Sequence, residues 1–138
     1  MREIKFRAWH KEEKIIGEVL GIDILHKEIF FSNEDIDCYE HSDFKDIELM
    51  QYTGLYDKKG KEIYEGDIVK LRANHGIGVI KYSDEWGAFV VEYIKPRPLV
   101  VLGMNYYKED IEVIGNIYEN PELIKEWDDE ILKNKNNR

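Results

Sequence analysis

The chain has 138 residues, of which 43% are hydrophobic and 36% charged, and its formal net charge is −9. These values predict a soluble globular domain with its own core, and they exclude disordered and collagen-like classes. No apolar run approaches the roughly 20 residues of a membrane-spanning helix, and residues 1–7 show no apolar signal segment. The single cysteine, Cys38, cannot form an internal disulfide, so we expect a cytoplasmic protein that does not associate with membranes.

The first third of the chain is predicted to form β-hairpins. Ile4, Phe6 and Ala8 recur at every second position, which is typical of a strand with one inward face. A second apolar run begins at Ile15, and we expect it to turn back near His26-Lys27. Residues 32–46 are rich in acidic and turn-forming residues and are predicted to be a loop that can include one helical turn, followed by a strand over 47–53.

A glycine-bearing segment follows. Asp57 to Gly60 is predicted to be a tight turn, because aspartate accepts backbone N–H bonds and glycine tolerates a positive φ. Gly66-Asp67 marks a second turn. Strands are then predicted over residues 68–71, 78–82, 86–93 and 111–118. The rhythm of turns and strands in residues 64–93 is typical of an SH3-like barrel.

A helix is predicted at the C-terminal end of the sequence. Asn120-Pro121-Glu122 is a typical helix start, and Leu123, Trp127 and Ile131 recur with helical spacing. The predicted fold is mainly β (α+β by strict count): N-terminal β-hairpins, a small SH3-like β-barrel and one C-terminal α-helix. We expect one domain, residues 1–138, with lobes over 1–53 and 54–120 and the helix over 121–133.

Catalytic and cofactor motifs are absent from the sequence. Gly54 and the Gly60-Lys61 pair are separated by five residues rather than four, and Glu62 replaces the hydroxyl residue of a phosphate-binding loop. Cys38 and His41 have the spacing Cys-x-x-His, but two ligands do not fill a tetrahedral zinc site. We therefore expect no catalytic residues, no metal site and no cofactor, and a hydrolase that uses Cys38 with a histidine is the least favoured hypothesis.

The charge is distributed unevenly along the chain. Residues 68–108 sum to +3, between acidic segments of −8 (residues 28–67) and −5 (residues 109–138). The basic segment combines cations with aromatic side chains, as surfaces that bind single-stranded nucleic acid do. The candidate nucleic-acid-binding residues are Lys70, Arg72, Lys81, Tyr82 and Trp86. The alternative is that these aromatic residues fill the core or a subunit interface, and the acidic balance of the chain favours it.

Three segments resemble the YopX family of phage and prophage proteins. They are Ile4 to Trp9, Tyr52 to Val69 and Ile114 to Leu123, which occur in the order expected for that family. His10 departs from the aspartate that is usual in the family. The resemblance implies a small protein of the bacterial host's cytoplasm without an established biochemical function, and it supplies no catalytic residues. Within the signature, we expect Gly54, Gly60, Gly66 and Asp67 to shape the turns, because a motif of glycines and apolar residues indicates a structural role.

The favoured functional hypothesis is a non-enzymatic, self-associating accessory protein that binds an unknown host or phage protein. Abundant tyrosine and segments of opposite charge support it. One alternative is nucleic-acid binding through residues 68–108. Another is an acidic mimic of DNA that blocks a host protein, which requires carboxylates in rows on one face.

Overall fold

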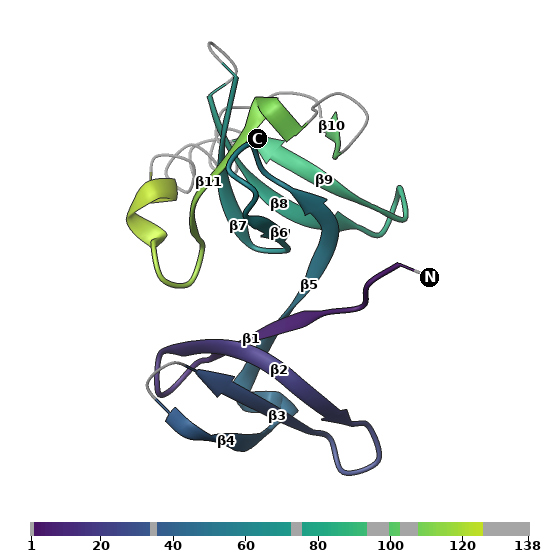
Figure 1. Ribbon diagram of the computed structural model, residues 1–138, viewed down its shortest axis with the longest axis vertical. Helices are drawn as coiled ribbons and strands as arrows, with labels where there is room; N and C mark the ends of the chain where they lie inside the picture. Colours follow the sequence, from purple (N-terminus) through teal and green to yellow (C-terminus); the bar gives the residue numbers. More distant parts are fainter. Residues whose placement is uncertain (1, 34–35, 73–75, 94–99, 103–107, 126–138) are drawn as a thin grey trace, which may run out of the picture. The chain divides into compact units, whose positions relative to one another are not determined.

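The computed structural model describes residues 2–33, 36–72, 76–93, 100–102 and 108–125, and these residues are mainly β (Figure 1). The chain divides into two compact units, Met1–Gly54 and Leu55–Arg138. Within the described part of the chain, no helix is long and apolar enough to cross a membrane.

The N-terminal unit is an antiparallel sheet. Its strands are β1 (Phe6–His10), β2 (Ile15–Asp23), β3 (Glu28–Asn33), β4 (Ile36–Asp43) and β5 (Ile47–Tyr56), with a 3₁₀ turn (Phe44–Asp46) before β5. Together with β6 (Glu62–Tyr64) they have the order β4-β3-β2-β1-β5-β6. The core of this unit consists of Ala8, Ile29, Phe31 and Ile47. The predicted hairpin at His26-Lys27 is confirmed, because β2 and β3 pair up to Asp23 and Glu28.

The prediction of a loop over residues 32–46 is wrong for residues 32–33 and 36–43, which are strand, whereas Phe44–Asp46 forms the single helical turn that the prediction allows. β3 continues to Asn33, and β4 pairs with it through Phe30 and His41, among others. β4 is at the edge of the sheet, where charged residues are common because the strand has a neighbour on one side. The acidic composition therefore indicates an edge strand here rather than a loop.

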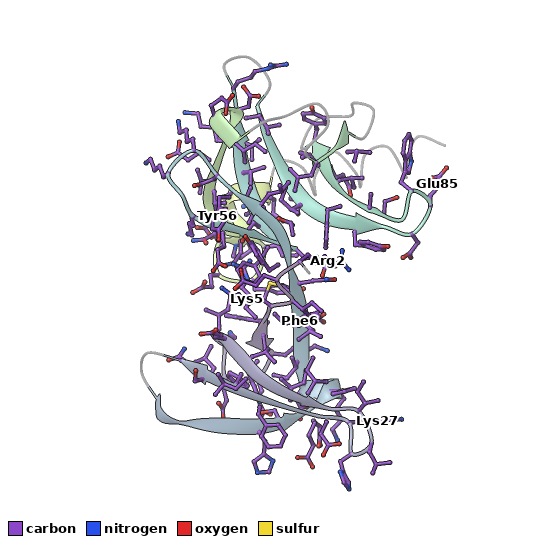
Figure 2. All side chains as sticks on the ribbon, turned by 45° about the vertical axis from the view of Figure 1, so that its right-hand side comes forward. Arg2, Lys5, Phe6, Lys27, Tyr56 and Glu85 are labelled. Carbon is purple, nitrogen blue, oxygen red and sulfur yellow. The ribbon has the colours of Figure 1, made fainter. Side chains whose placement is uncertain are left out.

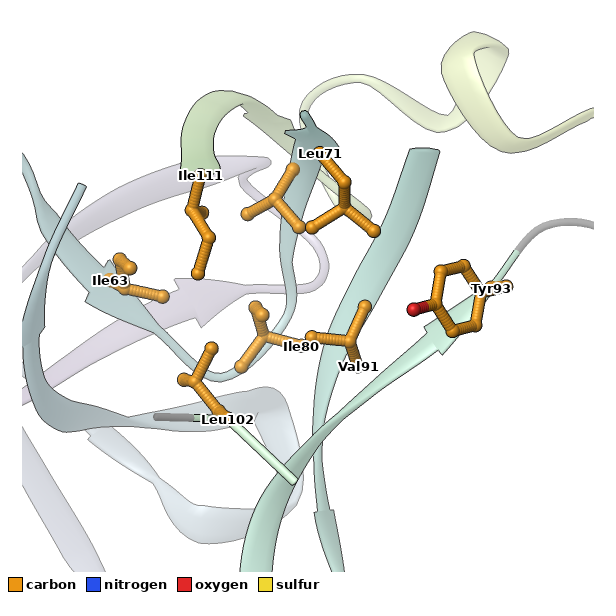
Figure 3. Packing of buried hydrophobic residues seen from close by; sticks show 8 residues of the cluster. Ile63, Leu71, Ile80, Val91, Tyr93, Leu102 and Ile111 are labelled. Atoms are coloured by element: carbon orange, nitrogen blue, oxygen red, sulfur yellow. The ribbon is translucent and has the colours of Figure 1, made fainter. Parts of the chain in front are cut away.

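The C-terminal unit contains a second antiparallel sheet. Its strands are β7 (Asp67–Leu71), β8 (Ile77–Ser83), β9 (Ala88–Tyr93), β10 (Val100–Val101) and β11 (Ile111–Asn116), in the order β10-β9-β8-β7-β11, and a 3₁₀ turn (Lys108–Asp110) precedes β11. One face carries the larger core cluster, which Figure 3 shows: Ile63, Val69, Leu71, Ile80, Val91, Tyr93, Leu102 and Ile111.

The opposite face of this sheet is also covered. Ile68 of β7 and Val79 of β8 pack with Ile124, which lies in a 3₁₀ turn (Pro121–Ile124) after the last strand. Neighbouring residues along a strand thus enter two different clusters, which explains why Ile68 and Val69 of β7, and Val79 and Ile80 of β8, are apolar at successive positions.

The described residues form two sheets and no closed barrel, so the predicted barrel over residues 54–120 is not what the chain builds. The succession of short strands and turns does produce an antiparallel meander from β7 to β9. Closing it would require the edge strands β10 and β11 to pair, and among the described residues β10 pairs with β9 and β11 with β7. A turn rather than a strand covers the outer edge of β11, as described below.

The predicted C-terminal helix is also corrected in part. Pro121–Ile124 is a 3₁₀ turn, and Asn120 makes no capping bond with its side chain. The Asn120 side-chain oxygen instead accepts the backbone N–H of Asn116 at 3.1 Å, so it is engaged with the preceding strand. Residues 126–133 of the predicted helix lie outside the described residues.

Candidate functional site

The turn after β5 is centred on the carboxylate of Asp57. This side chain is 1% exposed. Its Oδ1 accepts the backbone N–H groups of Lys59 (2.9 Å) and Lys61 (2.8 Å), and its Oδ2 accepts that of Val113 (2.9 Å). The Gly60 N–H in turn donates to the Asp57 carbonyl at 3.0 Å, which confirms the predicted tight turn. One carboxylate therefore joins the turn after β5 to β11.

The pKa of Asp57 is lowered from its usual value. Burial alone would raise this pKa, but the N–H donors of Val113, Lys61 and Lys59 favour the charged carboxylate and offset the burial. A buried carboxylate with three backbone donors stabilises the turn, and its lone pairs are already used by the protein itself. We therefore assign Asp57 a structural role.

The same turn covers the outer edge of β11. The Lys58 N–H donates to the Ile111 carbonyl at 2.9 Å, two residues before the contact between Val113 and Asp57. Unpaired N–H and C=O groups on an edge strand otherwise invite pairing with another chain. The side chains of Lys58 and Lys59 add ion pairs to Glu112 at 3.2 and 2.9 Å. These two lysines lower the pKa of Glu112, with the hydrogen bond from Lys59 as the largest cause.

The predicted turn glycines take backbone conformations that suit glycine. Gly54, Gly60 and Gly66 have φ values of 87°, 80° and 86°. Gly66 also bridges strands, because its N–H donates to Ile80 and its carbonyl accepts from Ile117. Asp67 is fully buried, and its Oδ2 accepts the Tyr64 N–H at 2.8 Å.

The structure separates the candidate nucleic-acid-binding residues. Lys70 of β7 and Lys81 of β8 lie on the same face, but Lys70 pairs with Ile77, four residues from Lys81. That spacing corresponds to about 13 Å along the strand. Tyr82 is on the opposite face, where its ring packs edge-on against Phe89 at 5.4 Å.

Two of the candidate cations lie beside carboxylates. Lys81 is 3.0 Å from Glu92, and Arg72 is 3.9 Å from Asp110. Trp86 is 61% exposed but lies in the turn before β9, rather than in the predicted strand. Figure 2 places Glu85 at the same turn, so an acidic residue adjoins this aromatic side chain.

The described residues contain no group of three or more metal-binding side chains. Cys38 belongs to β4, and its side chain is outside the described part of the structure. His41, its partner in the Cys-x-x-His spacing, instead contacts the Glu28 carboxylate at 3.0 Å.

The β2–β3 hairpin carries exposed apolar side chains that the sequence interpretation did not single out. Ile24 and Leu25, in the turn between the strands, are 77% and 84% exposed. Leu20 and Ile22 of β2 are also exposed, and Phe44 is joined to this turn by the bond from its N–H to the Lys27 carbonyl. Figure 2 places Lys27 at the turn. The signal was present in the sequence, because residues 19–25 hold five apolar side chains, more than one strand face can bury.

Carboxylates form a row at the same end of the hairpin. Asp23 pairs with Glu28, and Glu28 with Asp43, so the three residues lie side by side on β2, β3 and β4. Directly opposed residues on antiparallel strands point to the same face, and like charges there repel. Ile22 pairs with the buried Ile29 and therefore faces the other side of the sheet. We call the carboxylate row, together with Ile24 and Leu25 of the adjoining turn and with Phe44, the hairpin surface.

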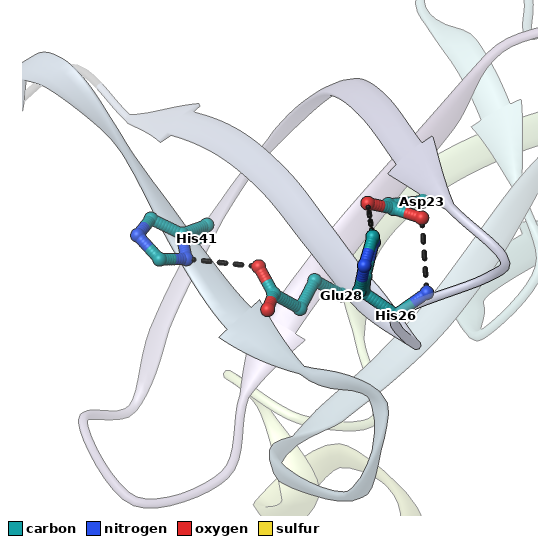
Figure 4. A network of polar contacts seen from close by, with 4 residues as sticks. All are labelled: Asp23, His26, Glu28 and His41. Atoms are coloured by element: carbon teal, nitrogen blue, oxygen red, sulfur yellow. Dashed lines mark hydrogen bonds and ion pairs between the residues drawn. The ribbon is translucent and has the colours of Figure 1, made fainter.

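Each of two carboxylates in this row contacts a histidine (Figure 4). His26 approaches Asp23 at 2.7 Å through Nδ1, and its backbone N–H also donates to Asp23 at 3.0 Å. The hydrogen bond and the charge of Asp23 raise the pKa of His26, while the backbone and side-chain bonds from His26 lower the pKa of Asp23. The histidines reduce the repulsion within the row when they are protonated.

Comparisons with known proteins agree on one family. The family model described as YopX protein matches residues 5–125. Protein EF1440 from Enterococcus faecalis is similar in structure, with 31% identity, 91% of this chain and all of that chain covered, and a TM-score of 0.60. Protein yopX from Bacillus subtilis has 25% identity, with 89% and 98% of the two chains covered, and a TM-score of 0.59. No curated protein matches.

Proposed function

The chain belongs to the YopX family, and from this premise we propose that it is a non-enzymatic accessory protein of a bacteriophage or prophage. It acts in the host cytoplasm by binding other proteins. The family itself has no established activity, so the proposal rests on the surfaces of this chain.

The hairpin surface is the observation that carries the proposal. Ile24 and Leu25 expose most of their side chains to water, and Phe44, whose N–H is bonded to the Lys27 carbonyl at the same turn, is partly exposed. Exposed apolar side chains beside polar residues mark sites of protein–protein contact, because burying them on association is favourable. Asp57, in contrast, directs both of its oxygens to backbone N–H groups, as a structural residue does.

We also propose that the protein self-associates. Residues 68–108 carry +3 and residues 28–67 carry −8, so these segments of different copies attract each other. The attraction is screened by salt, because exposed charges interact weakly beyond a Debye length of about 8–10 Å at physiological ionic strength.

Light scattering coupled to size-exclusion chromatography tests self-association. We expect a mass that is a multiple of the 16.4 kDa chain at low salt and that decreases as sodium chloride is added. A monomer at micromolar concentration at every salt level would remove the self-association from the proposal.

Nucleic-acid binding remains the second candidate, supported by the exposure of Trp86 and Tyr82. Lys81 and Arg72 weaken it, since each lies beside a carboxylate. Fluorescence anisotropy with labelled single-stranded DNA decides the question: binding that falls steeply with salt and is lost in Trp86→Ala supports this candidate. No binding at low salt excludes it.

The DNA-mimic candidate is supported by the row of Asp23, Glu28 and Asp43. A mimic of this kind attracts its target through charge alone. The apolar side chains beside the row distinguish the hairpin surface from such a mimic, and the experiment below separates the two.

A further inference from the structure

We propose that the hairpin surface binds a partner protein through a segment in which apolar side chains are flanked by lysine and arginine. This inference rests on the proposed protein-binding function and specifies the chemistry of the partner.

The apolar part of the partner follows from exposure. Ile24 and Leu25 lie side by side in the turn, and Phe44 follows β4 next to the Lys27 backbone. These side chains belong to two pieces of the chain, the β2–β3 turn and the start of the 3₁₀ turn, which the hydrogen bond between the Phe44 N–H and the Lys27 carbonyl brings together. A partner that covers them with apolar side chains removes apolar area from water, which favours association.

The cationic part of the partner follows from charge. Residues 15–43, which include β2, β3 and β4, contain eight acidic residues and one lysine, a formal charge of −7 with neutral histidines. The described counterions of the carboxylate row are His26 at Asp23, His41 at Glu28 and the exposed Lys45 at Asp43, 4.0 Å away. Lysine or arginine residues beside the apolar side chains of the partner would neutralise the row and remove the repulsion between opposed carboxylates.

The same charge argues against a second copy docking its own hairpin surface here. A symmetric contact would place two rows of Asp23, Glu28 and Asp43 against each other. Opposing like charges across an interface are costly. The partner therefore differs in charge from the hairpin surface itself.

Three fluorescein-labelled peptides of equal length test this chemistry by fluorescence anisotropy with the full chain. The first alternates leucine with lysine, the second replaces every lysine with glutamate, and the third replaces every leucine with serine. We expect the leucine–lysine peptide to bind about tenfold or more tightly than either of the others, with an affinity that falls as salt rises.

Two variants locate the binding on the hairpin surface. Ile24→Ser with Leu25→Ser is expected to weaken binding of the leucine–lysine peptide by about tenfold, and Asp23→Asn with Glu28→Gln is expected to weaken it and flatten its salt dependence. Ile4→Ser and Glu122→Gln are the matched controls, because both residues are exposed and lie outside the hairpin surface. Circular dichroism of each variant checks that the sheets remain folded.

Each other outcome overturns the inference in a defined way. The leucine–glutamate peptide could bind as tightly as the leucine–lysine peptide and lose its binding in the variant with Ile24→Ser and Leu25→Ser. That result would keep the protein-binding function but reject the cationic partner. Equal binding of the serine–lysine peptide would indicate a purely electrostatic DNA mimic. Peptide binding that the hairpin variants do not alter, or no binding of any peptide, would reject the hairpin surface as the site. A wild-type oligomer that the hairpin variants convert to a monomer would make a second copy the occupant.

Discussion

The side chain of Asp57 hydrogen-bonds to two parts of the chain that are far apart in sequence. Its two oxygens accept N–H groups from the turn and from β11. Asp57 and its partner Val113 in β11 are 56 residues apart in sequence. Removing the carboxylate leaves three donors without their acceptor in a buried place. Each buried donor that loses its acceptor costs roughly 1–3 kcal/mol of stability, and the cost is smaller where a water molecule can take the place of the acceptor.

We therefore predict that Asp57→Ala destabilises the protein by about 3 kcal/mol, as measured by urea unfolding. Asp57→Asn keeps one oxygen acceptor and should lose less stability than the alanine variant. Equal stability of wild type and Asp57→Ala would contradict the structural role that we assign to this residue.

The lowered pKa of Asp57 predicts a pH dependence with a definite sign. A carboxyl group with a lowered folded-state pKa contributes stability above its unfolded pKa of about 3.9, and loses it as pH falls through the folded-state pKa. The difference in stability between wild type and Asp57→Asn should therefore be largest near neutral pH and shrink below about pH 4. Urea unfolding at several pH values measures this difference, and a gap that widens in acid would show the opposite linkage.

His26 offers a second titration, on the surface. Its pKa is raised by Asp23, so its contribution is fully present below the unfolded histidine pKa of about 6.5 and disappears as pH rises through the folded value. We predict that the His26 ring resonances titrate above about pH 6.5 by NMR, and that Asp23→Asn moves this midpoint down. An unchanged midpoint in Asp23→Asn would mean that the contact is not formed in solution.

His10 supplies a hydrogen-bond acceptor to the turn that follows β1. It ends β1 and is buried, and its Nδ1 accepts the backbone N–H of Glu13 at 3.1 Å. An aspartate at this position offers an oxygen acceptor to the same turn. Either side chain therefore places an acceptor before the turn.

At the scale of elements, close approach of neighbouring strands restricts β2. A Cβ on Gly17 would overlap the Ser32 carbonyl oxygen of β3, which cannot move without breaking the pairing of the strands. Gly21 lies on the same strand, and the nearest atom to its Cβ position is a Phe30 ring carbon at 3.7 Å, an ordinary contact. The two glycines thus differ in environment although both are strand residues.

Alanine substitution at these two positions makes a matched pair. Gly17→Ala is predicted to destabilise the N-terminal unit by about 2–4 kcal/mol, while Gly21→Ala should change stability by less than about 1 kcal/mol. Thermal unfolding followed by circular dichroism compares the two variants. Similar losses in both would show that the packing of β2 on β3 does not set the requirement for glycine.

At the scale of the whole molecule, each unit has a core cluster of its own. Ala8 and Phe31 belong to the cluster of the N-terminal unit, and Ile80 and Val91 to that of the C-terminal unit. Units with separate cores open with separate free energies, as native-state hydrogen exchange shows in other proteins.

We predict that Gly17→Ala increases amide exchange in β2 and β3 while the amides of β8 and β9 keep their protection. Hydrogen–deuterium exchange with mass spectrometry measures both units in one sample, and Gly21→Ala serves as the control. Loss of protection in both sheets to the same extent would mean that the chain unfolds as one cooperative unit.

The sequence by itself determined the local features of this protein. Alternating apolar residues predicted strand β1, the polar pair His26-Lys27 predicted the β2–β3 hairpin, and Asp57 and Gly60 predicted the tight turn. These features depend on residues close in sequence, whose backbone preferences and hydrogen bonds act within a few positions.

Only the tertiary structure decided which strands meet and which side chains stay in water. β4 is a strand because β3 pairs with it, β11 is covered by the Asp57 turn instead of closing a barrel, and Asn120 bonds to Asn116 instead of capping a helix. Strand pairing likewise separates the candidate cations and leaves the apolar side chains of the β2–β3 turn exposed. Pairing between distant segments sets the face on which each side chain lies, and local sequence preferences do not encode that choice.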